Sequence, residues 1–416
     1  MAALPYIFWI STGLVIYTYA VYPLLLIAIA GIQQVVRDMR YAASRGDRRR
    51  KAVRGYHPRV SLVFSAYNEE AVIAAKMENC RTLTYPTEML EILAGCDGCS
   101  DRTAELARAA KLPNLTVFDS GEFAGRSGKP EVLNRLVKLA TGEFVIFSDA
   151  NTMLAPDAIA LLARHFNDPE GKEKIGCVCG ELRVQSRAGG PSTEGAYWRY
   201  EVFLKFLESR LGLLLGANGG VFAIRRDLFT PLPKQAIIDD FLVAMRIHDA
   251  GYSVVYDPEA TALEEAAAGV RDEFKRRVRI GAGNFHALRF TARLLSPTSG
   301  RVFFSYWSHK ILRWLVPFAL PLAFAAAVGI AECDQFSDAL RLFCGACAAG
   351  GLLMILLGLV GYRLELRDIH RSIFSVPYYF LSMNLALLLG FVRFVTGEQT
   401  TVWHRTARET PGPEKP

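Results

Sequence analysis

Apolar positions divide the chain into a mixed middle region and continuous apolar runs at both ends. Residues 6–36 contain no charged side chain. A helix needs about 20 apolar residues to cross a bilayer, so this run is long enough. Three further apolar runs lie at residues 311–331, 342–362 and 373–395. The pattern predicts one transmembrane helix before a soluble domain and further transmembrane helices after it.

The first run also has a possible reading as a cleaved signal peptide. A signal peptide has a basic start and an apolar core shorter than a full span. The chain instead begins MAALPYIF, without a basic side chain, and its apolar run is longer. A retained membrane anchor is therefore the expected reading.

The middle region alternates short apolar runs with helical stretches, which predicts an α/β domain. Expected strands cover residues 60–65, 90–94, 115–118 and 144–148, and expected helices cover 69–80, 103–110, 131–140 and 241–250. Apolar strands alternating with helices are typical of a mostly parallel sheet covered on both faces. Ligands then bind beyond the carboxyl ends of the strands.

These patterns divide the chain into segments with different roles. The expected segments are an N-terminal transmembrane helix (1–36), a basic cytoplasmic linker (37–57), a catalytic domain (58–298), an interfacial segment with C-terminal transmembrane helices (299–397), and a polar tail (398–416).

Positive charge favours one orientation in the membrane. The net charge is +7, and arginines are dense directly after the first apolar run, from Arg37 to Arg59. Such density marks the cytoplasmic side of a span. We therefore expect a multi-pass protein of the inner (plasma) membrane with a cytoplasmic catalytic domain, membrane lipids as partners and no nucleic acid. One conflict remains open: four spans place both termini outside, whereas His404, Arg405 and Arg408 favour the inside unless the last segment does not cross.

Eight cysteines include two closely spaced pairs, Cys96 with Cys99 and Cys177 with Cys179. Such pairs can hold zinc. No histidine lies near either pair at the spacing of a zinc finger, so free cytosolic thiols are the expected reading.

Polar residues follow three of the expected strands. Residues 65–70 (SAYNEE) follow the first strand, 96–103 (CDGCSDRT) the second, and 149–151 (DAN) the fourth. A strand end that leads into a helix offers free backbone N–H groups and carboxylates to a ligand. Each segment also has an ordinary local role, because Asn68 and Asp149 suit helix caps and Asp97 suits a turn.

Four later segments add candidate residues. They are 125–129 (GRSGK), 216–225 (GANGGVFAIR), 238–242 (IDDFL) and 275–280 (KRRVRI). The glycines permit close approach of the backbone to a ligand. The two aspartates could instead cap a helix, and the basic segment could rest on lipid headgroups.

In this order and spacing, the segments resemble glycosyltransferase family 2, which includes cellulose, chitin and hyaluronan synthases. The resemblance covers residues 58–288, and the flanking apolar runs are similar to the membrane-bound branch. It implies a GT-A fold, which is Rossmann-like with a mostly parallel sheet, together with transmembrane α-helices.

The resemblance also implies roles for individual residues. It assigns donor binding to Ala66, Tyr67, Asn68, Glu69, Asp97, Lys129, Asp149, Arg276 and Arg279, and acceptor binding to Gly219 and Gly220. Asp149 and Asn151 would hold Mn²⁺ or Mg²⁺ against the diphosphate. Asp240 would be the general base, with Asp239 orienting either the acceptor or Asp240.

Three of the departures from the family pattern bear on metal binding and processivity. Asn151 replaces a second acid and should weaken metal binding. Arg276 and Ile280 replace the glutamine and tryptophan of the processive members. The missing tryptophan would stack on a growing polymer, so its absence favours addition of a single sugar.

The expected function is that of an inverting glycosyltransferase of the hexosyltransferase type. It would move a sugar from a nucleotide-sugar donor, with a UDP-sugar expected, to a lipid-linked or saccharide acceptor at the membrane, in polysaccharide or glycolipid biosynthesis. Two alternatives stay open: a processive polysaccharide synthase and a non-catalytic membrane scaffold.

Overall fold

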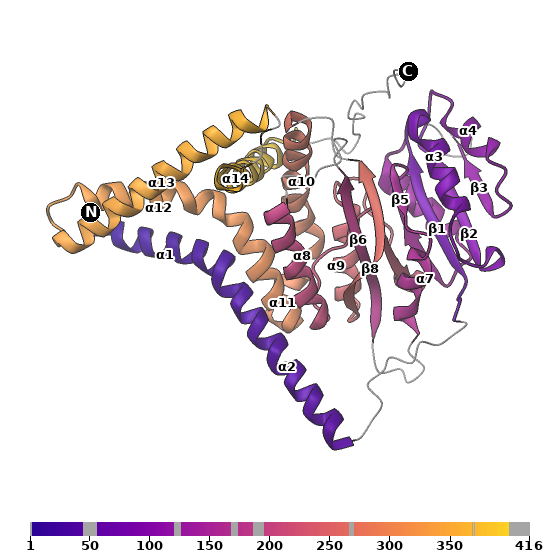
Figure 1. Ribbon diagram of the computed structural model, residues 1–416, viewed down its shortest axis with the longest axis horizontal. Helices are drawn as coiled ribbons and strands as arrows, with labels where there is room; N and C mark the ends of the chain where they lie inside the picture. The colour runs from indigo at the N-terminus through magenta and orange to yellow at the C-terminus, as the bar shows by residue number, and fades with distance from the viewer. Residues whose placement is uncertain are drawn as a thin grey trace.

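The computed structural model has a sheet domain and a helical arm that projects from it (Figure 1). It describes residues 2–44, 56–119, 126–167, 174–185, 195–265, 270–367, 369 and 371–398. Much of the predicted linker and nearly all of the predicted polar tail, including His404, Arg405 and Arg408, lie outside these residues.

One eight-stranded sheet forms the centre of the domain, in the order β3-β2-β1-β4-β7-β6-β8-β5. The strands are β1 (Val60–Ala66), β2 (Leu90–Cys96), β3 (Leu115–Phe118), β4 (Phe144–Phe147), β5 (Thr152–Leu154), β6 (Ile175–Gln185), β7 (Phe222–Arg225) and β8 (Ser253–Glu265). The strands β1 to β4 pair in parallel, as does β6 with β8. The strands β7 and β5 run antiparallel to their neighbours, so the sheet is mixed.

Helices cover both faces of this sheet, as the alternating pattern predicts. On one face, Leu62 and Phe64 of β1 pack with residues of α3 (Glu70–Arg81), α4 (Thr103–Ala109) and α7 (Ala158–Ala163). On the other face, Val63 packs with residues of α6 (Lys129–Leu139) and α9 (Asp239–Asp249). Successive side chains of a strand point to opposite faces, so β1 is buried on both sides and is apolar throughout.

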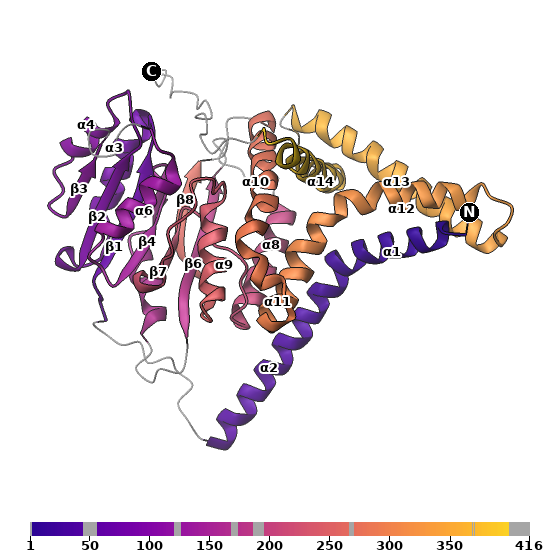
Figure 2. The ribbon, with the colours of Figure 1, turned by 180° about the vertical axis from the view of Figure 1, so that it is seen from behind.

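The arm consists of long apolar helices from both ends of the chain. They are α1 (Leu4–Ile16) and α2 (Tyr22–Ser44), joined by the π-turn η1 (Tyr17–Val21); α11 (Arg301–Ser305) and α12 (Leu312–Ala331), joined by the π-turn η7 (Tyr306–Ile311); α13 (Asp338–Glu365); and α14 (Ser372–Thr396). The helices α8 (Gly195–Arg210) and α10 (Val270–Thr291) lie between the arm and the sheet (Figure 2). Short 3₁₀ turns are η2 (Thr87–Met89), η3 (Arg164–Phe166), η4 (Arg226–Leu228), η5 (Ala292–Leu295) and η6 (Pro297–Ser299).

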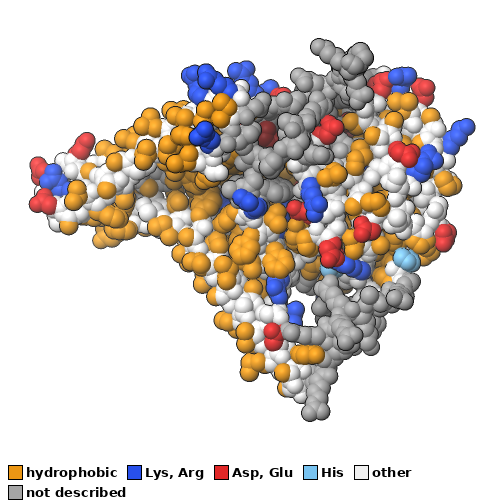
Figure 3. Space-filling view, in the orientation of Figure 1, with side chains coloured by type: hydrophobic (Ala, Val, Ile, Leu, Met, Phe, Trp, Pro, Cys, Tyr) orange, Lys and Arg blue, Asp and Glu red, His pale blue; other side chains and the backbone are white. Residues whose placement is uncertain are grey.

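Four helical stretches are long and apolar enough to cross a membrane: Leu4–Ala43, Arg301–Ala331, Asp338–Glu365 and Ser372–Thr396. Hydrophobic atoms cover most of the arm's surface (Figure 3). Along α13, for example, Leu352, Leu356 and Leu359 are each more than half exposed. An apolar surface of this size marks a membrane or protein contact, and the four stretches match the predicted spans in position.

Candidate active site

Six of the residues predicted to bind the donor or the metal meet in a cleft at the carboxyl ends of β1, β2 and β4. The cleft is lined by Ser65, Tyr67, Glu69, Asp97, Lys129, Asp149, Ala150 and Asn151. Ala66 pairs with Cys96 at the ends of β1 and β2, and β4 lies on the other side of β1. Parallel neighbours end at the same edge, so segments far apart in sequence converge there.

The loop after β1 is tied to the loop after β2. Asn68 has a left-handed backbone (φ 51°). Its side-chain oxygen accepts from the Ser100 backbone N–H at 2.9 Å, and its amide donates to Ser100 Oγ at 3.1 Å. The expectation that Asn68 caps the next helix is wrong, because Glu69 is the residue before α3 and Asp101 accepts from the Glu70 N–H.

Asp97 is buried and holds the loop that precedes α6. Its carboxylate accepts backbone N–H groups of Ser127 at 2.6 Å and Gly128 at 2.9 Å. The neighbouring Arg126 guanidinium lies over the Tyr67 ring at 3.7 Å. These contacts shape the outer wall of the cleft, where the resemblance places the nucleotide.

Lys129 joins the two predicted acidic centres. Its Nζ lies 2.8 Å from Asp149 Oδ1 and 3.1 Å from Asp239 Oδ2. Burial lowers the pKa of Lys129, but the carboxylates of Asp149, Asp239 and Asp240 raise it above its usual value. The residue is therefore a permanent cation between the predicted metal ligand and the predicted base.

A second lysine lies beneath Asp149. Lys76 of α3 is fully buried, and its Nζ donates to Ser148 Oγ at 2.8 Å and to the Thr152 carbonyl at 2.5 Å. Burial raises the pKa of Asp149, but Lys129, Lys76 and Arg279 outweigh this and lower it below its usual value. The sequence offered one signal for Lys76, since it falls on the apolar stripe of α3 beside Ile73 and Met77.

Asn151 lies beside an acid that the sequence pattern did not single out. Its Nδ2 donates to Glu264 Oε1 of β8 at 3.0 Å. Carboxylate and amide oxygens are the hard ligands that Mg²⁺ and Mn²⁺ take. Among the described residues, no cluster of three or more histidine, cysteine, aspartate or glutamate side chains could hold a metal by itself. Asp149 and Asn151 thus fit an ion that completes its shell with diphosphate oxygens and water.

Asp239 and Asp240 open α9 rather than precede it, because Ile238 is the capping position. Asp240 Oδ1 accepts the Phe241 N–H at 2.8 Å. Burial and the Asp239 carboxylate raise the pKa of Asp240 to about 6, against the opposing effects of Lys129 and this hydrogen bond. A carboxylate with such a pKa is suited to accept a proton near neutral pH.

The glycines predicted to bind the acceptor lie against these acids. A Cβ on Gly219 would lie 3.3 Å from Asp240 Oδ2. A Cβ on Gly220 would lie 2.7 Å from Thr152 Oγ1, which is closer than such atoms normally approach. Gly219 therefore packs tightly against Asp240, and Gly220 has no room for a side chain beside Thr152.

The two predicted arginines of α10 differ in position. Burial and Arg276 lower the pKa of Arg279, while Asp239, Asp240 and Asp149 oppose the shift, so Arg279 faces the acidic cluster. Arg276 is more exposed and pairs with Glu273 at 3.1 Å. The structure thus brings Arg279 closer to the cleft than Arg276.

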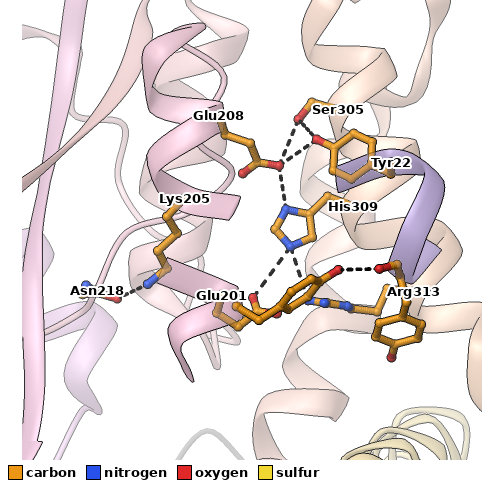
Figure 4. A network of polar contacts seen from close by, with 10 residues as sticks. Tyr22, Glu201, Lys205, Glu208, Asn218, Ser305, His309 and Arg313 are labelled. Atoms are coloured by element: carbon orange, nitrogen blue, oxygen red, sulfur yellow. Dashed lines mark hydrogen bonds and ion pairs between the residues drawn. The ribbon is translucent and has the colours of Figure 1, made fainter. Parts of the chain in front are cut away.

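A buried polar network that sequence reasoning missed joins the domain to the arm (Figure 4). Glu208 of α8 accepts from Tyr22 Oη at 2.8 Å and lies 2.6 Å from His309 Nδ1. Arg313 pairs with Glu201. Glu201 lies one turn before Lys205 on α8. Lys205 in turn donates to Asn218 Oδ1 at 2.7 Å, next to Gly219. One face of α8 therefore connects the arm to the cleft.

The closely spaced cysteines lie in strands or at a strand end. Cys177 and Cys179 are buried in β6, and Cys96 ends β2. Burial raises the pKa of Cys177 well above its usual value, so that residue is a protonated thiol.

Comparison with known proteins shows that the residues of the cleft belong to a stretch of sequence that matches a known family. The profile described as "Glycosyltransferase like family 2" matches residues 57–283, more than half of the chain. The matched stretch includes all the cleft residues and ends within α10.

Two curated relatives match similar stretches. The protein called probable glycosyltransferase YdaM, from Bacillus subtilis, is 26% identical over 270 residues, covering 59% of this chain and 60% of that protein. The poly-β-1,6-N-acetyl-D-glucosamine synthase of Staphylococcus aureus is 28% identical over 242 residues, or 55% of each protein. The chain thus spans little more than half the length of these relatives.

One solved structure resembles most of the chain. It is the mannosyltransferase PcManGT from Pyrobaculum calidifontis, in complex with GDP-Man and Mn²⁺. It is 21% identical, has a TM-score of 0.64, and covers 91% of this chain and 99% of its own. This likeness shows a shared fold that includes helices as well as the sheet.

Proposed function

Because the chain belongs to glycosyltransferase family 2, we propose that it is an inverting glycosyltransferase that moves one sugar from a nucleotide-sugar donor to an acceptor at a membrane. One observation carries the proposal. The acid expected at the diphosphate, Asp149, and Asp239, the neighbour of the proposed base, contact one ammonium group, at 2.8 Å and 3.1 Å from Lys129 Nζ. Donor and acceptor chemistry can therefore share one cleft.

In this proposal Asp240 accepts the proton of the attacking acceptor hydroxyl. A sugar hydroxyl is a weak nucleophile until its proton is being removed, so a base of raised pKa at that position speeds the attack. Burial and repulsion by Asp239 keep the pKa of Asp240 high. Gly219 leaves room beside the carboxylate for the acceptor.

Positive charge in the cleft stabilises the departing diphosphate. Lys129 and Arg279 both face the acidic cluster, and fixed cations stabilise negative charge as it develops on a leaving group. Mn²⁺ or Mg²⁺, when held by Asp149 and Asn151, would supply further charge neutralisation. The Mn²⁺ bound by the structurally similar mannosyltransferase supports this assignment.

The donor and acceptor follow from position. Tyr67, Asn68, Glu69 and Asp97 line or shape the part of the cleft next to Asp149, which suits a nucleotide, with a UDP-sugar proposed. The apolar arm would hold the domain at the inner membrane, where a lipid-linked or saccharide acceptor is available. The dense arginines after the first span favour a cytoplasmic catalytic domain.

A processive synthase is the second candidate, because one relative is a poly-β-1,6-N-acetyl-D-glucosamine synthase. Ile280 stands where processive members carry a tryptophan that stacks on the polymer, so we favour single addition. The length of the product decides between the two: one added sugar supports our proposal, and long chains support the alternative.

The decisive experiment is transfer from a panel of nucleotide sugars, with Mn²⁺ and membrane extract as acceptor, by the wild type and two variants. We expect Asp240→Asn to lower kcat about 10²- to 10⁴-fold, the usual contribution of a general base, with UDP binding nearly unchanged. Asp249→Asn, at the other end of α9 and partly exposed, is the matched control and should keep its activity. Equal activity of the wild type and Asp240→Asn would exclude Asp240 as the base, and no turnover of any donor would favour a scaffold.

A further inference from the structure

The last helix, α14, is long and apolar enough to cross a membrane, but its contacts with the other helices favour a different position. We propose that α14 lies along the membrane surface on the side of the catalytic domain, with its outward face in the lipid interface. The chain then crosses the bilayer through the other three candidate spans. This inference concerns the arm alone and does not depend on the proposed activity.

The direction of α14 differs from that of the other arm helices. Figures 1 and 2 show α1, α12 and α13 running along the arm, whereas α14 is seen end-on at the base of the arm. The tip of the arm carries charge, because Asp334 in the turn between α12 and α13 and Asp338 at the start of α13 are almost fully exposed beside Arg341. Charged ends with an apolar surface between them define a bilayer-crossing direction that α14 does not share.

The contacts that the α13 glycines make with α14 lie toward the C-terminal end of α13. Gly358 approaches Pro377 and Leu381, and Gly361 approaches Phe374. The other half of α13 packs on α1 and α12, through Cys344 and Ala348. A fourth span antiparallel to α13 would be expected to contact it along much of its length of about 42 Å.

Most of α14 instead follows α10, which is a polar helix. The two backbones touch at Gly281 and Gly390, where an added Cβ would lie 2.6 Å from the Ala282 nitrogen. The Arg277 guanidinium lies over the Tyr379 ring at 5.4 Å, and Arg289 lies over Phe394 at 5.2 Å. Arginines at both ends of this contact place it at the water interface, because a bilayer centre excludes such charges.

The contacts of α14 with the other arm helices indicate the same depth of α14 in the membrane, at the water interface. Phe380 packs on Tyr19 of η1, and Phe391 packs on Phe318 of α12. Both partners lie close in sequence to groups of the polar network: Tyr19 to Tyr22, and Phe318 to Arg313 (Figure 4). These contacts place the part of α14 around Phe380 and Phe391 level with the boundary between arm and domain.

The outward face of α14 is suited to contact lipid at the membrane surface. Its exposed large side chains are all apolar: Ile373, Val376, Leu385, Leu389, Val392 and Val395. Exposed arginines at 363, 367 and 371 precede it. An apolar face flanked by basic side chains is the pattern of a helix that lies on an anionic lipid surface. This arrangement also puts His404, Arg405 and Arg408, which follow α14 in the sequence, on the side that their charge favours.

The test is the side of the membrane on which each end of the chain lies. Epitope tags are placed at the N-terminus, in the exposed turn at residues 333–337 and at the C-terminus of the full chain, and are probed with an impermeant protease in sealed vesicles of both orientations. We expect the C-terminal tag to be cleaved together with the catalytic domain, and the other two tags from the opposite side. Cleavage of all three tags from one side, opposite to the domain, overturns the proposal.

A matched pair of substitutions tests the depth of α14. Leu385 is near the middle of α14 and Leu352 near the middle of α13, and both are about half exposed, at 50% and 52%. Leu385→Lys should keep its membrane-inserted, folded fraction near that of the wild type, because a lysine at the surface reaches water. Leu352→Lys should lower this fraction several-fold. An equal effect of the two substitutions contradicts the proposal.

Discussion

At the scale of single residues, the proposed role of Asp240 gives a prediction for how activity depends on pH. In that proposal Asp240 accepts a proton only when it is ionised, and burial with Asp239 raises its pKa to about 6 from an ordinary value near 4. We therefore expect kcat/KM to be maximal above pH 7 and to fall about tenfold per pH unit below 6. The measurement is a kcat/KM profile between pH 4.5 and 8 at saturating Mn²⁺.

The neighbouring acid provides the control for this profile. Asp239→Asn removes the repulsion and should move the acid limb to lower pH, whatever its effect on the maximal rate. An acid limb centred near pH 4 in the wild type, or one that does not move in Asp239→Asn, would mean that another group accepts the proton.

A second residue-scale prediction concerns the neutral ligand Asn151. Asn151→Asp creates a second carboxylate next to Asp149 and only 3.0 Å from Glu264 Oε1. We expect the metal-free variant to unfold at a lower temperature than the wild type, because the new charge repels Glu264. Mn²⁺ should bind more tightly, because two carboxylates attract the ion more strongly than one. Calorimetric titration and thermal unfolding with and without Mn²⁺ measure both effects.

The control for Asn151→Asp removes the opposing charge. Asn151→Asp with Glu264→Gln should recover metal-free stability while keeping the tighter Mn²⁺ binding. If Mn²⁺ affinity is unchanged in both variants, residue 151 is not a ligand.

The residues foreseen from the sequence share a physical reason, as do those that were missed. Asp97 and Asp149 follow apolar strands, so the strand pattern alone places them at one edge of the sheet. Lys76 comes from the helix α3, and Glu264 comes from β8, a strand far from β1 in the sequence. Their positions depend on tertiary packing, which no local pattern specifies.

At the scale of elements, hydrophobic periodicity predicted the first half of the domain well. The strand at 115–118 was predicted with its observed bounds, and β1 was predicted to within one residue. The expected GT-A fold is confirmed by the shared fold. The reversal of β7 and β5 could not be foreseen, because a buried antiparallel strand is as apolar as a parallel one.

The turn that enters β7 gives a prediction at this scale. A Cβ on Gly220 would lie 2.7 Å from Thr152 Oγ1, an atom that is buried and has no hydrogen-bond partner among the described residues. Gly220→Ala should therefore destabilise the protein by about 1–3 kcal/mol, the usual cost of overpacking, and should lower transfer activity. Thermal unfolding and the acceptor KM are the measurements.

A second substitution, at Thr152, tests whether the Thr152 side chain causes the destabilisation by Gly220→Ala. Thr152→Ala removes Oγ1 and Cγ2 without breaking a described hydrogen bond, so Gly220→Ala with Thr152→Ala should regain most of the stability and activity. No recovery in the double variant would show that Gly220 is needed for its backbone conformation instead.

At the scale of the whole molecule, the arm and the catalytic domain are joined through charged groups rather than apolar packing alone. Glu208 is fully buried on α8. Burial raises the pKa of Glu208, but His309 and neighbouring donors outweigh this, so the carboxylate stays ionised. The sequence gives no sign that Glu208 contacts Tyr22 and His309, because Glu208 lies more than 100 residues from each of them along the chain.

Removal of Glu208 should loosen this joint. Glu208→Leu removes the carboxylate at His309 Nδ1 and leaves Glu201, 3.7 Å from Nε2, as the acid beside that ring. Loss of one member of a buried ionic contact costs up to about 3–5 kcal/mol. We expect a clearly lower unfolding temperature in lipid nanodiscs. Glu259→Leu is the control, because Glu259 is 65% exposed in its ion pair with Arg164, and exposed pairs contribute about 1 kcal/mol or less.

A double substitution separates charge pairing from packing. In Glu208→Leu with His309→Leu, no buried partner is left unpaired by the change at Glu208, and Tyr22 and Ser305 keep their mutual hydrogen bond of 2.9 Å. Replacing both partners of a buried contact by apolar groups is often nearly neutral, so the double variant should be more stable than Glu208→Leu alone. If Glu208→Leu destabilises no more than Glu259→Leu, the joint rests on apolar contacts instead. The same α8 face reaches Asn218 beside the cleft through Lys205, so a loosened joint should also lower transfer activity.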